Sequence, residues 1–236
     1  MTGTYKIADE IIFVESVYPT VHEYYRGYEA SGTPDFSVKT SVEDIVFERE
    51  RTENGEMFPD SYLEEIAMYR KICEKMPYYD TFLFHGSCIA VDGEGYLFGA
   101  PSGTGKSTHA KLWCDNLGER AVMVNDDKPL LRICGDGAYA YGTPYNGKHR
   151  RGENTKVRLK AICMLSQSPD NGIREITRSE AYPLIIGQTY RPYDREAFVK
   201  TLDLVDRLFE NVKLYSLRCN MEKEAFEVSY NKMREA

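Results

Sequence analysis

Hydrophobic residues follow two different spacings along the chain. Short apolar runs, bounded by Gly, Pro, Asn or Asp, are typical of strands, and apolar residues three or four apart are typical of helices. The strands expected from the runs are 7–14, 36–38, 45–48, 81–84, 87–91, 96–99, 121–124, 130–134, 138–141, 157–165, 173–176 and 212–217. The helices expected from the spacing are 19–29, 60–76, 109–117, 179–187, 194–209 and 222–233.

Strands and helices mixed in this way predict an α/β protein with mixed sheets flanked by helices. A chain of 236 residues, 42% of them apolar and 28% charged, can bury one substantial core. We therefore expect one compact unit over 59–236, with residues 1–58 forming a β-rich N-terminal segment that packs on it. No internal repeat is visible.

Charge and cysteine content narrow the class of protein. The net charge of −7 predicts no general attraction to nucleic acid or to an acidic membrane. No apolar run is long enough to cross a bilayer, and the first residues lack the apolar core of a secretion signal, so we expect a cytoplasmic protein. The six cysteines are scattered and are expected to be free thiols in a reducing compartment.

A glycine-rich stretch after the apolar run 96–98 has the pattern of a phosphate-binding loop. Such a loop joins a strand to a helix, aims backbone N–H groups at phosphate oxygens, and adds a lysine charge and a hydroxyl that can reach Mg²⁺. Ala100 stands where the strict pattern has glycine. A chance Gly/Ser surface turn is the alternative, but the expected flanking strand and helix favour the loop. The candidate residues are Ser102, Gly103, Thr104, Gly105, Lys106, Ser107 and Thr108.

Two carboxylates follow the buried-type strand 121–124. Asp126 and Asp127 come directly after Asn125, one expected helix beyond the glycine-rich loop. A short helical crossover is expected to place this strand beside the loop strand, which would bring the acids to a Mg²⁺ ion or an acceptor hydroxyl. The alternative is an acidic turn ahead of Lys128.

A basic, glycine-rich segment spans residues 142–154. Between Lys148 and Lys160 there are six Lys or Arg residues against one Glu, in a chain that is otherwise acidic. We interpret this segment, with Lys148, Arg150 and Arg151, as a loop that binds the substrate or its phosphate. A solvated charged loop is the alternative.

With these motifs in view, residues 84–165 resemble the HPr kinase/phosphorylase family and, more distantly, the phosphoenolpyruvate carboxykinases that share its variant phosphate-loop fold. Thr108 stands where HPr kinases typically have Glu, and the segment 142–154 replaces their glycine-rich signature. The layout looks closer to compact HPr-kinase-related proteins, including kinases of ribosomal peptide precursors. The motifs that carry the resemblance are His85-Gly86, Gly95-Tyr96-Leu97-Phe98, the loop from Ser102 to Ser107, and Asn125-Asp126-Asp127.

The resemblance implies an ATP- and Mg²⁺-dependent kinase that phosphorylates a serine-type hydroxyl of a protein, peptide or small molecule. Its partners would be a nucleotide and this acceptor, and an oligomer is possible. Two other classes stay open. One is a carboxykinase-like or pyrophosphate-linked phosphotransfer enzyme. The other is a non-catalytic nucleotide sensor, against which the acidic pair argues, because a sensor needs no base.

The resemblance also implies roles for single residues. Lys106 would hold the β- and γ-phosphates, and Ser107 with one carboxylate would hold Mg²⁺. The other carboxylate would be the base. The family suggests Asp126 as base and Asp127 as metal ligand, although the sequence does not determine which side chain faces the nucleotide.

Three further residues complete the expected site. His85 matches the family's histidine near the transferred phosphate; a hydrogen-bonded core histidine is the equal alternative. Arg150 and Arg151 are expected to neutralise charge on the transferred group, since phosphoryl transfer depends mainly on positioning and charge.

Overall fold

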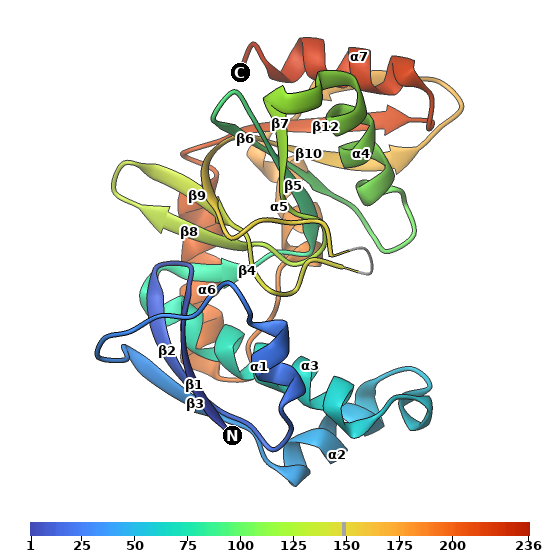
Figure 1. Cartoon of the computed structure of the whole chain (residues 1–236). Coiled ribbons are helices and arrows are strands. Elements are labelled where there is room, and N and C mark those ends of the chain that lie inside the picture. Colours follow the sequence, from blue (N-terminus) through green and yellow to red (C-terminus); the bar gives the residue numbers. More distant parts are fainter. Residues whose placement is uncertain (148–149) are drawn as a thin grey trace.

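The computed structural model describes residues 1–147 and 150–236 as an α/β fold built on two sheets (Figure 1). The smaller sheet is N-terminal and has the order β1-β2-β3. Its strands are β1 (Thr2–Ile7), β2 (Glu10–Glu15) and β3 (Phe36–Lys39), and the short helix α1 (Thr20–Tyr24) lies between the last two in sequence. β1 and β2 are antiparallel, whereas β3 runs parallel to β2.

The larger sheet has nine strands and carries the glycine-rich loop. Its main path is β4-β8-β9-β10-β6-β5-β7, and β12 pairs with both β10 and β11. The long strand β10 is parallel to β6 on one edge and to β12 on the other. The bounds are β4 (Thr81–Leu83), β5 (Gly86–Val91), β6 (Glu94–Gly99), β7 (Ala121–Asn125), β8 (Leu130–Cys134), β9 (Gly137–Tyr141), β10 (Lys156–Gln167), β11 (Gly172–Glu175) and β12 (Lys213–Cys219).

One expected neighbour relationship is wrong. The strand that ends in the acidic pair, β7, does not lie beside the loop strand β6, because β5 runs between them and is antiparallel to both. β6 and β7 are therefore parallel to each other, and their carboxyl ends lie at the same edge of the sheet. The glycine-rich loop and the carboxylates still meet at that edge, one strand apart.

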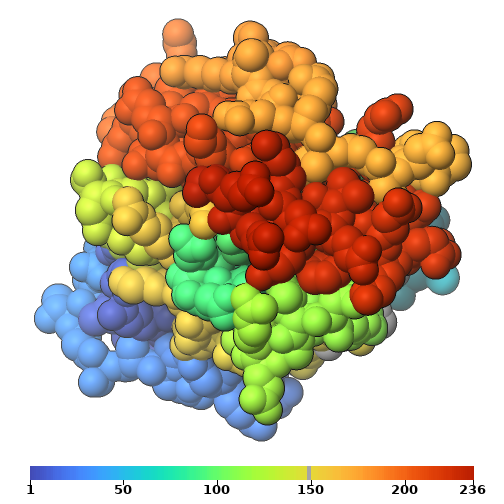
Figure 2. All heavy atoms as spheres, turned by 90° about the horizontal axis from the view of Figure 1, so that it is seen from above, coloured from blue at the N-terminus to red at the C-terminus, as the bar shows by residue number. Residues whose placement is uncertain are grey.

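Helices cover both faces of the large sheet. They are α4 (Lys106–Leu117), α5 (Arg178–Gln188), α6 (Arg195–Leu208) and α7 (Lys223–Met233). Alternate side chains of β6 point to opposite faces: Leu97 joins a core with α5 and α6, and Phe98 joins a core around Trp113 of α4 and Phe226 of α7. Seen from above, the red C-terminal segment lies against the green segment that contains α4 (Figure 2).

The small sheet packs on α3 (Asp60–Lys75) rather than on the large sheet alone. The buried residues Tyr25, Met68 and Ile72 share one core with Leu130 of β8 and with Tyr145. The carboxylate of Glu64 is buried there and accepts hydrogen bonds from the backbone N–H groups of residues 17 and 18, at 2.6 and 2.8 Å. α3 thus joins the N-terminal segment to the edge of the sheet that carries the acidic pair.

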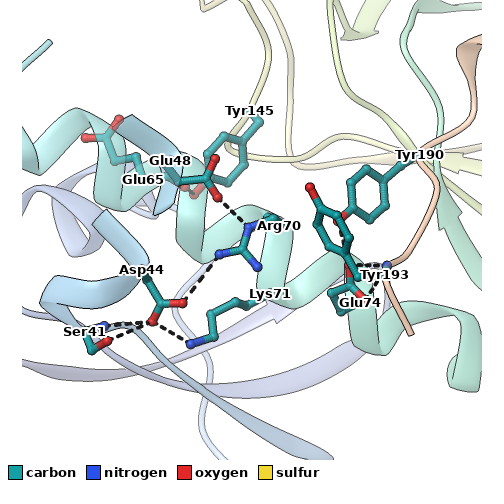
Figure 3. Close-up of polar contacts among 10 residues, drawn as sticks. All are labelled: Ser41, Asp44, Glu48, Glu65, Arg70, Lys71, Glu74, Tyr145, Tyr190 and Tyr193. Carbon is teal, nitrogen blue, oxygen red and sulfur yellow. Dashed lines mark hydrogen bonds and ion pairs between the residues drawn. The ribbon is translucent and has the colours of Figure 1, made fainter. Parts of the chain in front are cut away.

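Residues 45–48 are not a strand, as their apolar run suggested, but part of α2 (Val42–Arg51). The reason is a capping box: the Ser41 backbone N–H donates to Asp44 at 3.0 Å and begins the helix. Only Ile45 and Glu48 of α2 are buried, at helical spacing. Arg70 and Lys71 of α3 then pair with Asp44, and Arg70 also pairs with Glu48 (Figure 3).

Two other N-terminal expectations need correction. The expected strand 7–14 is interrupted by a hairpin turn, because Ala8 and Asp9 have φ of +50° and +70°, and the strands on either side are β1 and β2. The expected helix 19–29 is only the five residues of α1. The chain leaves the helical path at Tyr25 and turns at Gly27, whose φ is +89°.

The remaining strands and helices are confirmed to within a few residues, and the α/β class with them. Short 3₁₀ turns occupy Gly55–Met57, Met76–Tyr79 and Gly118–Arg120. All six cysteines are free thiols. No helix in the described part of the chain is long and apolar enough to span a bilayer.

Candidate functional site

The glycine-rich stretch forms a turn between the end of β6 and the start of α4. Gly103 and Gly105 have φ of +79° and +110°, a region that side chains with a Cβ rarely adopt, which explains glycine at both positions. Gly105 is the N-cap of α4, and no side chain caps this helix. The first-turn N–H groups of a twelve-residue helix therefore face the cleft in front of the loop.

Lys106, the first residue of α4, reaches back across the turn. Its Nζ donates to the carbonyl oxygens of Ala100 at 2.8 Å and Pro101 at 3.4 Å, and the side chain is buried. Burial lowers the pKa of Lys106, and the charges of Asp127 and Asp126 oppose that shift. The lysine is therefore held at the floor of the cleft, close to both carboxylates.

Asp126 is buried on the same side of the cleft. Its Oδ1 accepts a hydrogen bond of 2.9 Å from the hydroxyl of Ser87, on the neighbouring strand β5. Burial raises the pKa of Asp126, and hydrogen bonds from Ser87 and Ser107 partly offset this. The carboxylate thus lies beside the loop hydroxyl of Ser107 and carries a desolvation cost that a cation would relieve.

Asp127 has different partners. Its Oδ1 lies 3.3 Å from Nε2 of His85, and its backbone carbonyl accepts a 3.0 Å hydrogen bond from Gly86. Burial acts to raise the pKa of Asp127, but the hydrogen bond from His85 and the positive charges of Lys128, His85 and Lys106 outweigh it and lower the pKa. Asp127 is therefore ionised near neutral pH and is held by His85.

Two residues that position the acidic pair have no role assigned to them from the sequence. The buried side chain of Asn125 accepts from the backbone N–H groups of Asp127 and Lys128, at 2.9 and 2.7 Å, and donates to Thr143 at 3.0 Å. An Asn at the end of a strand before a turn is a recognisable signal for such bonds. Ser87 carries no comparable signal, because its role depends on the pairing of β5 with its neighbours.

Two adjoining cavities meet at Asp127 and Gly147. The first, of about 410 Å³, lies in front of the glycine-rich loop and is also lined by His85, Lys106 and Asp126. The second, of about 390 Å³, extends towards α1 and α3. Gly147 has φ of +79°, and a Cβ there would lie 3.3 Å from Cβ of Asp127. A side chain at position 147 would thus crowd Asp127, which lines both cavities.

A third cavity lies on the other side of the glycine-rich loop. It has a volume of about 520 Å³ and is lined by loop residues and by the apolar side chains of Leu112, Pro169 and Met221. Gln167 forms part of its wall and donates to the carbonyl oxygens of Gly103 and Thr104 at 3.3 and 3.4 Å. The loop is therefore flanked by a polar cavity and a more apolar one.

The basic segment is only partly at the cleft. Arg150 lines the second cavity, with its Cζ 4.6 Å from the centroid of the Tyr24 ring. Arg151 is exposed, but its charge acts to lower the pKa of Asp126. Lys148, also expected here, lies outside the described residues.

The expected site residues otherwise come together. His85, Lys106, Asp126 and Asp127 line one cavity with the loop residues. In the ranges 1–147 and 150–236, no group of three or more His, Cys, Asp or Glu side chains is placed to hold a metal ion. A metal here would need hydroxyl and phosphate oxygens in addition to a carboxylate, as Mg²⁺ commonly does.

No protein-family model and no curated protein matches the chain. Among solved structures it is similar to the Hpr(Ser) kinase/phosphatase from Coxiella burnetii, with 10% sequence identity and a TM-score of 0.38. The match covers 65% of this chain and 97% of the other. It is a distant structural relationship. What the cleft can do has to follow from its own residues.

Proposed function

We propose that this protein is an ATP-dependent kinase that transfers the γ-phosphate to a hydroxyl group. The observation that carries the proposal is the meeting of Lys106, held under a strand–turn–helix loop, with Asp126 and Asp127 in one cavity. A loop of this shape supplies N–H groups and a lysine charge to phosphates, and the carboxylates supply a metal ligand and a base.

The nucleotide would bind along the loop. Backbone N–H groups from Gly103 to Thr108 and the ammonium group of Lys106 would hold the phosphates in the first cavity. The nucleoside would extend into the third cavity, whose apolar walls suit a planar base. In this arrangement the hydrogen bond from Gln167 to the Gly103 carbonyl holds the loop between the first and third cavities.

The residues present fit a magnesium ion next to Ser107. Asp126 is a buried carboxylate without a cationic hydrogen-bond partner among the described residues, and it lies beside the Ser107 hydroxyl. We propose that these two side chains hold Mg²⁺. When bound, the ion would neutralise charge on the phosphate oxygens. This assignment reverses the one suggested by the family resemblance.

Asp127 is then the base. It is the carboxylate that lines both cavities, so an acceptor entering the second cavity meets it first. The acceptor oxygen bonds to the γ-phosphorus while the bond to the β–γ bridging oxygen breaks and ADP leaves. The hydroxyl proton passes to the carboxylate of Asp127, which His85 holds in position.

Arg150 would act next to this carboxylate. It lines the second cavity with Asp127, where its guanidinium could neutralise the transferred group. Arg151, whose charge reaches Asp126, would add to the field on the metal side. Both roles require the arginines to act more strongly in transfer than in ATP binding.

Conversion of ATP to ADP tests the proposal. Purified protein with Mg²⁺ and ATP is expected to form ADP, slowly with water and faster with a competent hydroxyl acceptor. Lys106→Ala is expected to abolish ADP formation. Lys111→Ala is a matched control, since Lys111 lies on the same helix, is exposed and, among the residues that the structure describes, pairs only with Asp115. Equal ADP formation by wild type and Lys106→Ala would overturn the proposal.

A further inference from the structure

The second cavity is built largely by the N-terminal part of the chain. Asp127 and Gly147 form the end shared with the nucleotide cleft. The opposite wall comes from α1 and α3, through Tyr24, Tyr62 and Glu65. A compound in this cavity would therefore touch the proposed base at one end and aromatic rings with a carboxylate at the other.

The structure shows no stabilising contact of the Glu65 carboxylate with any described residue. Its neighbour Glu64 is fully buried and hydrogen-bonded to backbone, whereas the carboxylate of Glu65 accepts no hydrogen bond from any described residue. In Figure 3 the ion pairs of α2 and α3 are dashed, and no dashed line reaches Glu65. A partly buried carboxylate without a partner carries a desolvation cost.

The charges around Glu65 are few. Burial is the main cause that raises the pKa of Glu65 to about 7, Glu64 and Glu23 raise it further, and Arg150 acts to lower it. No ion pair joins Glu65 to Arg150 in the part of the chain that the structure describes. A cationic group that entered the cavity would thus find a carboxylate free to bind it.

The aromatic wall is fixed in place. Tyr145 stacks on Tyr69 with ring centroids 3.9 Å apart, and its hydroxyl donates to the backbone carbonyl of Glu65 at 2.8 Å. The ring centroids of Tyr24 and Tyr145 are 5.2 Å apart, and Cζ of Arg150 lies 4.6 Å from the centroid of the Tyr24 ring. Arg150 thus occupies the face of Tyr24, and the ring of Tyr62 and the carboxylate of Glu65 remain for a ligand in the same cavity.

We infer that the phosphoryl acceptor is a small hydroxyl compound that carries a positively charged amine, bound by Glu65 and the tyrosine rings with its hydroxyl at Asp127. This inference rests on the proposed kinase function. The volume of about 390 Å³ suits a small molecule better than a folded protein. The positive charge suits an unpaired carboxylate among aromatic rings, as in known sites for quaternary ammonium groups.

Lys128 does not contradict a cationic ligand. Its Nζ lies 3.9 Å from Oδ2 of Asp127, so its charge is partnered at the end of the cavity shared with the nucleotide. There it meets the phosphate rather than the amine. With Glu65 at one end of the second cavity and Asp127 at the other, an amino alcohol would bind with its amine at Glu65 and its hydroxyl towards the nucleotide.

The experiment compares matched acceptors in the presence of Mg·ATP. L-Serine, choline and D-glucosamine are each paired with a neutral counterpart: N-acetyl-L-serine, 3,3-dimethylbutan-1-ol and N-acetyl-D-glucosamine. Both ADP formation and the phosphorylated product are measured. At least one amine is expected to stimulate ADP formation and to become phosphorylated. The concentration needed for half-maximal stimulation is expected to be at least about tenfold lower for this amine than for its neutral counterpart.

Variants identify the group responsible. Glu65→Gln is expected to lower the preference for the amine over its neutral counterpart by about tenfold and to leave Mg·ATP affinity unchanged. Glu23→Gln removes a nearby exposed carboxylate of α1 that does not line the cavity, and it is expected to keep the preference. Circular dichroism and melting curves of both variants show whether they fold as wild type does.

Three outcomes would overturn the inference. They are equal use of amine and neutral compounds, an unchanged preference in Glu65→Gln, and phosphorylation of hydroxyl peptides with no response to any amine. Each of these leaves Mg·ATP binding and γ-phosphate transfer intact, so the kinase proposal survives. Failure of the kinase proposal itself would show as the absence of Mg·ATP binding or of ADP formation, and both are measured first.

Discussion

Nε2 of His85 lies 3.3 Å from Oδ1 of Asp127, where the loop cavity and the second cavity meet. The two residues come from different parts of the large sheet, since His85 precedes β5 and Asp127 follows β7. The contact lowers the pKa of Asp127 against the effect of its burial. It distinguishes Asp127 from Asp126, whose carboxylate accepts a hydrogen bond from the Ser87 hydroxyl instead.

The first prediction separates the two carboxylates. Asp127→Asn is expected to keep Mg·ATP affinity and lose transfer by about 10²–10⁴-fold, the usual contribution of a positioned base. Asp126→Asn is expected to lose affinity and transfer together, with partial recovery at high Mg²⁺, because its defect is in holding the ion. Calorimetry and transfer rates across a Mg²⁺ series measure both. The opposite pattern would restore the assignment suggested by the family resemblance.

The second prediction concerns pH. Asp127 must be ionised to accept a proton, and its pKa is lowered with His85 as the largest lowering cause. Removing that partner in His85→Ala is therefore expected to raise the pKa of Asp127, so that transfer activity falls at a higher pH on the acid side than in wild type. The pH profile of kcat/KM measures the shift. An acid limb that stays in place would mean that His85 does not act through Asp127.

The third prediction concerns stability. The pKa of Glu65 is raised to about 7, so the folded chain holds this proton more tightly than the unfolded chain, and stability falls as pH rises from about 4.5 to 7. Glu65→Gln removes this loss. It is expected to melt about 2–4 °C above wild type at pH 8, the shift that about 1 kcal/mol gives in a chain of this size.

The same melting curves contain their own control. Well below pH 4.5, wild type and Glu65→Gln are expected to melt at similar temperatures, because there the carboxyl group is protonated in both the folded and the unfolded state. Glu23→Gln leaves the Glu65 carboxyl group in place and is expected to gain less than Glu65→Gln at pH 8. A gain in Glu65→Gln that is equal at both pH values would rule out titration of Glu65 as its cause.

The fourth prediction concerns the basic segment. Replacing Arg150 and Arg151 by Ala is expected to lower the transfer rate at least tenfold and to change Mg·ATP affinity much less, because charge on the transferred group matters most in the transition state. Single-turnover rates and calorimetry give the two numbers. If the double variant transfers phosphate to its acceptor at the wild-type rate, the segment is better interpreted as a solvated surface loop.

Much of the site is predictable from the sequence because its signals are local. The turn needs Gly103 and Gly105 for their positive φ, the lysine must follow the turn, and the acids must follow a strand. Each of these requirements concerns residues close together in the chain. The glycine-rich turn, the placement of the acidic pair after a strand and most strands and helices are therefore predictable from the sequence.

The rest depends on contacts between distant segments. Nothing local in the sequence links Tyr24, Tyr62 and Glu65 to Asp127, because only the docking of α1 and α3 brings them into one cavity. The hydrogen bond of Ser87 with Asp126 depends on strand pairing in the same way. Residues 45–48 show a different limit. Their apolar run predicts a strand, but the capping box at Ser41 starts a helix there.

The most direct test of the account is the affinity of wild type and Lys106→Ala for Mg·ATP, measured by calorimetry with Lys111→Ala as control. Lys106 is predicted to contact the phosphates, and losing a charge-assisted contact worth about 1.5–3 kcal/mol weakens binding by about 10–100-fold. Lys111→Ala is predicted to bind as wild type does. Equal affinity in wild type and Lys106→Ala, or no binding in either, would contradict the assignment of this loop to a nucleotide.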